Sequence, residues 1–530
     1  MITASKSSPS GSSVMADTGP ISDPARHRSL RVRLVLSCLF GSFALYYFTC
    51  APGLLWQDSA MFQYRVERFN LAGDIGLPLA HPLYIVLAKL VAFLPLGESA
   101  FRVNLFSALC GAVALALLAD LLYSLTSSIW AGLIGVISLA ISHTFWTHSV
   151  IAEVYNLYTV GLFAELCLIE RLMRTRQIKW LVLAALVNGL NLSNHLMAIL
   201  HWPAYAGLLY WAARQRLLKP AHAVGILAAL AVGSSLYLYI IGLELLAGRP
   251  FVEVFREALV GPPHRAEHVL AYSFPWLRQI RNSVIYFGLN FPTPIILLAP
   301  VGFAAALRAA SLRWIAWLAG GMFVVAFVFA FRYTVPDQFA FFTPCYALVS
   351  LFIGIGAAQV IQASSAMRTS CLVLAMLPVA VYEFAPPVMS ARKVSIGVSR
   401  EVAYRDNYEY FIRPRKNGYR GTERYVREAL ERAAPDGLIY ADTTIINALI
   451  YARDIWRVEP DVVLFGAWDI EPDPPRLEPT VAAISAFVDR GAAWSAVADS
   501  NYMSKWMREA FTTEPDGLLY RLVHRPAAAR

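Results

Sequence analysis

The sequence predicts an all-α, polytopic membrane bundle followed by a soluble C-terminal α/β domain. Of its 530 residues, 57% are hydrophobic and only 15% are charged, whereas soluble domains are about 25% charged. Charge-free apolar runs recur from residue 31 to residue 384, and runs of about 20 residues can cross a bilayer as helices. They lack the alternation of barrel strands. We therefore expect an integral membrane protein with about 12–14 helical spans.

Polarity divides the chain into three parts. Residues 1–29 are rich in Ser, Pro and Ala and end in a basic cluster, which is typical of a disordered cytoplasmic N-terminus. Residues 30–384 form the predicted membrane domain, whose first outer loop covers 51–81. Residues 385–530 are predicted to lie outside. The expected location is a bacterial inner (cytoplasmic) membrane. The net charge of +9 is attributed to loops beside spans rather than to nucleic-acid binding.

The apolar runs follow one another at short intervals. The first covers 31–50, and the loop after it mixes charges with apolar residues, which is typical of a helix lying in the membrane interface. Three runs between 81 and 153 give an odd number of crossings, so we expect one to be re-entrant or two to be parts of a bent element. The run 180–213 is predicted to be two spans joined by an outer polar turn at 191–195. The other expected spans lie near 82–96, 104–123, 128–145, 152–170, 222–242, 284–306, 314–331, 339–361 and 371–384.

The C-terminal part alternates helical and β-rich patterns. Helices are expected at 422–433 and 443–452, and strands at 437–440, 462–465, 494–497 and 517–523. Helices between strands predict a small α/β domain with a mostly parallel sheet. No G-x-G-x-x-G sequence opens a helix there, so no nucleotide site is predicted.

Asp58 is the first candidate for chemistry. It lies in the first outer loop beside Trp56 and Phe62, where burial could raise the pKa of its carboxyl group and suit it to general base catalysis on a lipid-borne substrate. The alternative is a solvated loop acid that caps a helix.

Two further polar groups interrupt apolar runs. Glu153 stands among apolar residues at the start of a span, where an ionisable side chain either lines a cavity or lies at the interface near a helix N-terminus. Asn191, Asn194 and His195 could bind a phosphate or a sugar hydroxyl, or could staple two helices together.

The remaining candidates flank prolines. His81 precedes Pro82 and is a substrate-binding candidate or a cap. Arg332 and Asp337 lie at an outer helix end, where Arg332 could pair with a lipid phosphate or anchor the chain among head groups. No cofactor is predicted. Asp58 and Glu153 could hold a divalent metal, but nothing in the sequence requires one, and the six cysteines lie in or beside apolar runs.

Three segments occur in an order that resembles a known family. They cover 102–109, 146–155 and 189–195, and weaker matches follow at 333–346, 406–416 and 441–443. The family, long described as a domain of unknown function, is grouped with the transmembrane protein O-mannosyltransferases of the GT-C glycosyltransferase superfamily. The resemblance is dense over about 53–210.

The resemblance implies a GT-C fold and inverting transfer of a mannose-like sugar from a polyprenyl-phosphate donor to a protein, lipid or glycan hydroxyl. It gives Asp58 the role of general base, and it makes Glu153, Asn194 and His195 motif positions. The sequence departs from the family where Ser59 follows Asp58, since relatives tend to carry a Glu nearby, and in a shortened proline-rich run at 80–84. The alternatives are a transporter or flippase of lipid-linked sugars and a non-catalytic scaffold.

Overall fold

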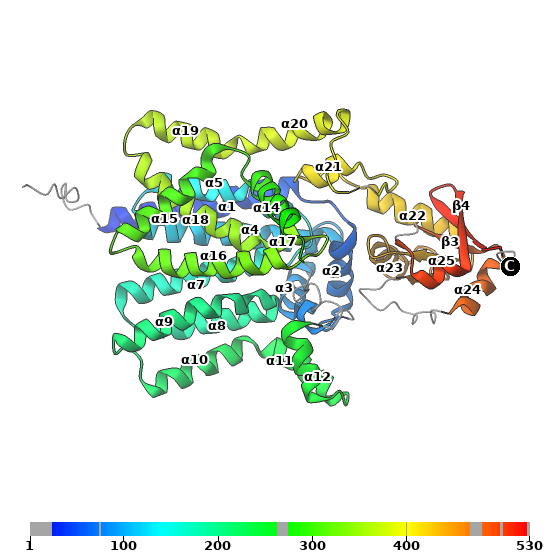
Figure 1. Ribbon diagram of the computed structural model, residues 1–530, viewed down its shortest axis with the longest axis horizontal. Coiled ribbons are helices and arrows are strands. Elements are labelled where there is room, and N and C mark those ends of the chain that lie inside the picture. Colours follow the sequence, from blue (N-terminus) through cyan, green and yellow to red (C-terminus); the bar gives the residue numbers. More distant parts are fainter. Residues whose placement is uncertain are drawn as a thin grey trace, which may run out of the picture.

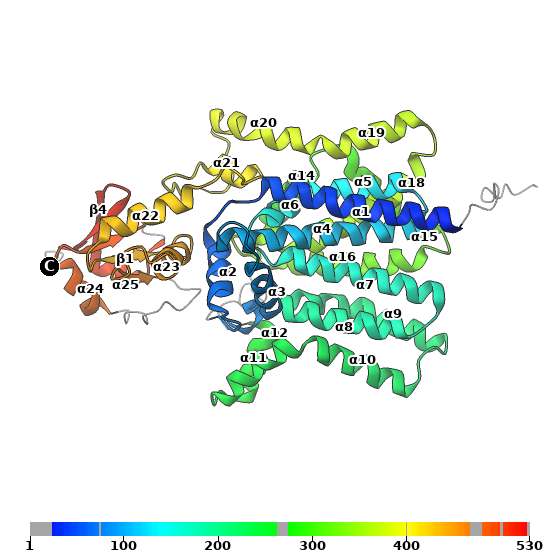
Figure 2. The ribbon, with the colours of Figure 1, turned by 180° about the vertical axis from the view of Figure 1, so that it is seen from behind.

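The computed structural model describes residues 24–73, 76–261, 274–398, 400–466, 480–498 and 502–526. A bundle of roughly parallel helices forms most of the molecule, and a smaller domain with a β-sheet lies at one end (Figures 1 and 2). Of the predicted disordered N-terminus, residues 1–23 lie outside the described residues. Residues 24–29, which the sequence predicts to be disordered, are helical, since the first helix already begins at Pro24.

The bundle consists of helices joined by short connections. Its first half contains α1 (Pro24–Thr49), α2 (Gln57–Arg68), η1 (Leu77–Leu79), α3 (Pro82–Ala92), α4 (Ser99–Thr126), α5 (Ile129–Ala140), α6 (His143–Val150), α7 (Tyr155–Thr175), α8 (Lys179–Asn194), η2 (Leu196–His201) and α9 (Trp202–Arg214). Its second half contains α10 (Pro220–Gly233), α11 (Ser235–Leu246), α12 (Phe251–Val260), α14 (Trp276–Asn290), η3 (Pro294–Leu297), α15 (Leu298–Arg308), α16 (Arg313–Arg332), α17 (Gln338–Phe341), α18 (Thr343–Val360), α19 (Ser365–Met376) and α20 (Pro378–Ala391).

Several of these helices can cross a membrane. By length and composition, α1, α4, α16, α18 and the continuous segment Ser365–Ala391 qualify singly. Three bent pairs bring the number to as many as eight: α5–α6 (69°), α10–α11 (68°) and α14–α15 (107°). This is fewer than the 12–14 spans expected from sequence. Helices α7, α8 and α9 run alongside the others in Figure 1 although they do not meet these limits.

The odd crossing number before Glu153 has a structural explanation. Helix α3 has only 11 residues, or about 16 Å at 1.5 Å per residue, which is too short for a ~30 Å hydrocarbon layer. Helix α4 and the bent α5–α6 pair then supply two crossings and return the chain to the side of the first outer loop. Of the three expected runs, the one near 82–96 therefore does not cross, and the bend between α5 and α6 lies within the single run expected near 128–145.

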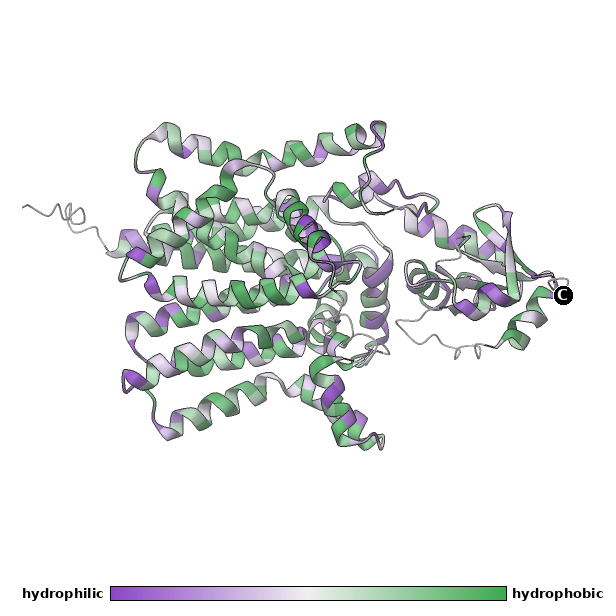
Figure 3. Cartoon of the chain, viewed as in Figure 1, coloured by the Kyte–Doolittle hydropathy of each residue, from purple (hydrophilic) through white to green (hydrophobic). Residues whose placement is uncertain are grey.

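The bundle surface is suited to lipid. Large apolar side chains such as Val224, Leu227 and Trp317 are exposed on α10 and α16. The ribbon of the bundle is mainly hydrophobic, whereas hydrophilic segments gather in the C-terminal domain (Figure 3). Inside the bundle α15 and α18 approach closely. Gly302 makes this possible, since a Cβ atom at that position would overlap the Phe352 carbonyl. Small residues commonly allow such contacts between membrane helices.

The C-terminal domain is α/β, as predicted, but its sheet is mixed. Strand β1 pairs in parallel with β2 and β3, whereas β5 is antiparallel to β3 and β4, in the order β2-β1-β3-β5-β4. The domain contains α21 (Asn407–Ile412), α22 (Gly421–Ala433), β1 (Leu438–Ala441), α23 (Ile446–Asp454), β2 (Val463–Gly466), α24 (Val481–Val488), β3 (Ala493–Ser495), α25 (Lys505–Ala510), β4 (Phe511–Asp516) and β5 (Leu519–His524). The hairpin strand β4 was not predicted.

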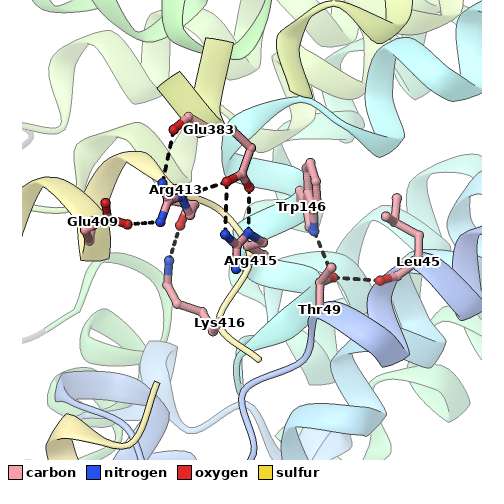
Figure 4. Close-up of polar contacts among 8 residues, drawn as sticks. All are labelled: Leu45, Thr49, Trp146, Glu383, Glu409, Arg413, Arg415 and Lys416. Atoms are coloured by element: carbon pink, nitrogen blue, oxygen red, sulfur yellow. Dashed lines mark hydrogen bonds and ion pairs between the residues drawn. The ribbon is translucent and has the colours of Figure 1, made fainter. Parts of the chain in front are cut away.

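A polar network fastens the start of this domain to the bundle (Figure 4). The Glu383 carboxylate of α20 accepts hydrogen bonds from Nε and Nη2 of Arg415, at 2.6 and 3.0 Å. It also forms an ion pair with Arg413 at 3.2 Å. The backbone N–H of Lys416 donates to the Thr49 carbonyl at the end of α1. The chain therefore leaves the bundle at a defined place before it forms the sheet.

The C-terminal domain covers helix α2. Trp56 donates its indole N–H to the Tyr419 hydroxyl at 2.5 Å, and Tyr64 donates its hydroxyl to Asp454 of α23 at 3.1 Å. Residues Ser59–Val66 are all buried. The predicted interfacial segment is indeed helical, and the helix lies between the bundle and the C-terminal domain.

Arg65 holds the rest of the first loop. Its side chain is fully buried, and its guanidinium donates to the carbonyls of Asn70, Leu71, Leu79 and Ala80 at 3.2, 2.9, 3.4 and 2.5 Å. A planar fork with five donors can satisfy several acceptors at once, whereas a lysine ammonium offers three donors from a single point. Arg65 therefore closes the loop just before His81.

We expect Arg65→Lys to destabilise the protein by about 3 kcal/mol, because carbonyls in the closed loop lose charged donors. Arg68→Lys is the matched control, since Arg68 is exposed on the same helix and should change stability by less than about 0.5 kcal/mol. Thermal unfolding of the purified proteins in detergent measures both. Equal melting temperatures for the two variants would contradict this role.

Two carboxylates meet where the C-terminal domain contacts the bundle. Glu98 precedes α4 and Glu423 lies on α22, and a Cβ atom on Gly53 would overlap an oxygen of each. These two oxygens are buried without a hydrogen-bond partner. Burial, and then the neighbouring Glu423, raise the pKa of Glu98 to about 7.

Raising the pH should therefore weaken this contact. The folded protein binds the Glu98 proton more tightly than the unfolded chain, so stability falls as the pH rises from 4.5 through about 7. Glu98→Gln should raise stability by about 1 kcal/mol at pH 8 and by little at pH 5. Melting temperatures at the two pH values test this, and an equal effect at both would count against it.

Candidate active site

A cavity of about 90 Å³ lies at the end of the bundle that faces the C-terminal domain. Its wall combines three carboxylates, two imidazoles and a set of apolar and aromatic side chains. They come from α2, η1, the two connections around Glu153 and His195, and the segment before and within α17. The lining residues are Asp58, Met61, Phe62, Leu79, His81, Glu153, Val154, Tyr155, His195, Tyr333, Val335, Asp337 and Phe341.

Helix α2 positions Asp58 in its first turn. The preceding Trp56 is 1% exposed, so the start of the helix is anchored in the protein interior. The Asp58 side chain is exposed and lines the cavity. The next residue, Ser59, points inward and donates to the Ala152 carbonyl at 3.1 Å. Asp58 and the connection that carries Glu153 are therefore held together by neighbouring groups.

The connection before α7 is pinned from three sides. The Ser59 hydroxyl donates to its Ala152 carbonyl. Ser107 of α4 accepts the backbone N–H of Glu153 and donates to its carbonyl, at 3.1 and 3.2 Å. Asn194 donates its amide to the Val154 carbonyl at 3.2 Å. Three separate elements therefore hold the backbone that carries the Glu153 side chain.

His81 adopts a backbone conformation that its neighbours must support. Its φ of +48° is left-handed, which is uncommon for a residue other than glycine. The ring nitrogen Nδ1 donates to the Asn194 carbonyl at 2.5 Å. Burial, and then His195 close by, hold the pKa of His81 well below its ordinary value of 6.5. The neutral ring therefore keeps an unprotonated Nε2 that can accept a hydrogen bond.

His195 offers the complementary group. Helix α8 ends at Asn194, and the His195 Nδ1 accepts the Met197 backbone N–H at 3.2 Å, which starts η2. Burial lowers the pKa of His195 to about 3, so its ring is neutral and its proton is on Nε2. The His81 and His195 ring centroids lie 4.9 Å apart. The pair therefore presents one hydrogen-bond acceptor, the His81 Nε2, and one donor, the His195 Nε2–H.

The three carboxyl groups of the cavity affect one another, so that ionising Glu153 is unfavourable. Burial, and then Asp58 and Asp337, raise the pKa of Glu153 well above its ordinary value. A protonated Glu153 can donate a hydrogen bond, which an ionised one cannot. Three carboxyl groups around a small cavity suit a ligand that is rich in hydroxyl groups.

Sequence reasoning missed the aromatic wall. Tyr155 contacts His195 and Phe341, with ring centroids 5.4 and 5.8 Å away, and Tyr333 contacts Phe341 at 4.7 Å. Tyr333 and Tyr155 stand beside the predicted Asp337 and Glu153 in the sequence, but their types do not distinguish them from ordinary core aromatics. Only the close approach of α7 and α17 shows that they share a cavity.

The structure brings five of the seven predicted site residues to this cavity: Asp58, His81, Glu153, His195 and Asp337. Asn194 is not among the lining residues, and its amide donates to the Val154 carbonyl. Arg332 does not line it either, and its guanidinium stacks 4.4 Å from the Phe274 ring centroid. Within the described residues, no three His, Cys, Asp or Glu side chains are arranged to hold a metal.

The fold has a solved counterpart. ArnT from Cupriavidus metallidurans, bound to undecaprenyl phosphate, aligns with a TM-score of 0.53 at 12% identity, covering 94% of this chain and 98% of ArnT. ArnT in the apo state gives a TM-score of 0.51 over the same shares of the two chains. The chain is thus an integral membrane protein with the GT-C fold, as the resemblance implied.

Sequence comparison adds a more specific likeness. Residues 74–218 match the Protein O-mannosyl-transferase TMEM260 N-terminal domain. The chain is 32% identical over 142 residues to mouse (Mus musculus) Protein O-mannosyl-transferase TMEM260, which is 26% of this chain and 20% of the mouse protein. The family match over 74–218 contains His81, Glu153 and His195 but not Asp58. The chain thus matches about a fifth of the length of this relative.

Glu153→Gln should stabilise the protein at neutral pH by about 1 kcal/mol, because it removes a carboxyl group whose ionisation is unfavourable in the folded state. The folded-state pKa lies above the unfolded value of 4.5, so the gain should shrink as the pH falls toward 4.5. Melting temperatures at pH 7.5 and pH 5 measure it. A variant less stable than the parent at pH 7.5 would rule out this electrostatic account.

Proposed function

We propose that the protein is a membrane glycosyltransferase that moves a mannose-like sugar from a polyprenyl-phosphate carrier to an acceptor hydroxyl. The observation that carries the proposal is the cavity lined by Asp58, Glu153 and Asp337 together with His81 and His195. Support for the donor class comes from ArnT, solved with undecaprenyl phosphate. Support for the sugar and the acceptor comes from the TMEM260 relative, named a protein O-mannosyltransferase.

In the proposed reaction the acceptor oxygen attacks the anomeric carbon of the sugar. The bond from that carbon to the phosphate oxygen breaks, and its electron pair leaves with the polyprenyl phosphate. Asp58 takes the proton of the acceptor hydroxyl. Attack on the side opposite the leaving phosphate inverts the anomeric configuration. No nucleotide sugar takes part.

Charge favours one orientation of the donor. Three carboxyl groups repel a phosphate but accept hydrogen bonds from sugar hydroxyls. We therefore place the sugar in the cavity, with Glu153, Asp337 and the His195 Nε2–H as its partners. The phosphate would lie toward Arg332, which directly precedes Tyr333 of the cavity wall. A guanidinium suits this role because it can bind two phosphate oxygens at once.

Asp58→Asn should lower sugar transfer by about 10²- to 10⁴-fold, the usual effect of losing a general base. The assay uses the full chain in liposomes with labelled polyprenyl-phosphate mannose and a Ser/Thr-containing acceptor peptide. Asp461→Asn is the matched control, because Asp461 is an exposed carboxylate of the C-terminal domain, and it should retain activity.

Two outcomes would count against the proposal. Full transfer by Asp58→Asn would remove Asp58 from the role of base. Movement of the intact lipid-linked sugar across the bilayer, with no release of polyprenyl phosphate, would instead identify a flippase, since transfer must break the sugar–phosphate bond.

A further inference from the structure

A second, larger cavity lies at the opposite end of the bundle. Its volume is about 490 Å³. It lies among the beginning of α1, the end of α7 and the start of α8, at the end farthest from the C-terminal domain (Figure 2). Its residues are Arg28, Arg31, Val32, Val35, Leu36, Asp120, Arg171, Arg174, Thr175 and Trp180. The proposed transferase reaction uses none of them.

The cavity is basic. Four arginines line it against one carboxylate, Asp120. Arg31 is already paired, since its Nε and Nη2 bind the two Asp120 oxygens at 2.5 and 2.7 Å. Among the lining side chains, three arginines therefore have no lining carboxylate to balance their charge: Arg28, Arg171 and Arg174. Glu170, next to the cavity, offsets part of this, with 3.6 Å between its Oε1 and the Arg174 Nε.

Two of these arginines are held in place. The Arg171 guanidinium stacks 5.2 Å from the Trp180 ring centroid, and the Trp180 indole N–H donates to Thr175 at 3.0 Å. Glu170 also accepts the Ser124 hydroxyl at 2.6 Å, which fixes the carboxylate beside Arg174. Donors that are already positioned lose less entropy when they bind an anion.

One wall of the cavity is aliphatic and open to lipid. Val32, Val35 and Leu36 follow Arg28 along one side of α1, and Val32 and Leu36 are 48% and 45% exposed. From Arg28 to Leu36 the helix rises about 12 Å. A basic group and an apolar wall over this distance match a phosphate and the start of an acyl chain.

We propose that this cavity binds the head group of an anionic glycerophospholipid in the leaflet opposite the candidate active site. Arg28, Arg171 and Arg174 bind its phosphate, and the α1 wall contacts its acyl chain. Basic pockets between membrane helices are known to suit such head groups. A zwitterionic lipid fits less well, because its ammonium would enter a site that already has excess positive charge. This proposal is independent of the transferase reaction.

The test measures thermal unfolding of the purified full chain in detergent with phosphatidylglycerol, phosphatidylcholine or inorganic phosphate. Phosphatidylglycerol should raise the melting temperature of the parent by several degrees, and the other two additives should have little effect. Arg171→Gln/Arg174→Gln should lose at least half of this shift. Arg308→Gln/Arg313→Gln, which removes two charges at the turn between α15 and α16, should keep it.

Native mass spectrometry provides a second measurement. The parent and the Arg308/Arg313 control should retain one more phosphatidylglycerol than the Arg171/Arg174 variant. If that double variant does not fold, Arg28→Gln at the exposed start of α1 takes its place. An equal shift and equal retention in all proteins would overturn the proposal. An equal shift with inorganic phosphate would identify a free-anion site instead of a lipid site.

Discussion

The buried guanidinium of Arg65 is the contact on which the candidate active site depends. It lies about two turns after Asp58 on the same helix, and it donates hydrogen bonds to the carbonyls of the loop that ends just before His81. A buried charge is tolerated only when its hydrogen bonds are satisfied. The geometry that satisfies this one side chain therefore also sets the relative positions of the Asp58 carboxylate and the His81 imidazole, which both line the cavity.

The C-terminal domain acts on the same helix from the other side. It covers α2 through Trp56 and Tyr64, while Ser59 joins α2 to the connection before α7. Helix α2 is thus held between two domains. The acid pair Glu98 and Glu423 lies at the same junction, so pH can weaken the contact that presents Asp58 to the cavity. The geometry of the candidate active site and the docking of the C-terminal domain are therefore linked through one short helix.

The two ends of the bundle have opposite electrostatic character. Carboxylates dominate the cavity beneath the C-terminal domain, and arginines dominate the cavity where α1 begins. The acidic end suits hydroxyl groups and proton transfer, whereas the basic end suits the phosphate of a lipid head group. Under the two proposals, one face of the molecule would carry the reaction and the other would bind a lipid of the surrounding leaflet.

Composition and periodicity determined the membrane class and the α/β tail, and they selected Asp58, Glu153 and His195 as candidates, because hydrophobic length and isolated polar groups are local properties of the chain. They could not show that α3 is too short to span, since an apolar run does not reveal where its helix stops. They could not separate Asn194, which staples backbone, from His195, which lines the cavity, although the two are adjacent. Those assignments, and the aromatic wall of Tyr155 and Tyr333, depend on which elements distant in the chain pack together, and only the tertiary structure decides that.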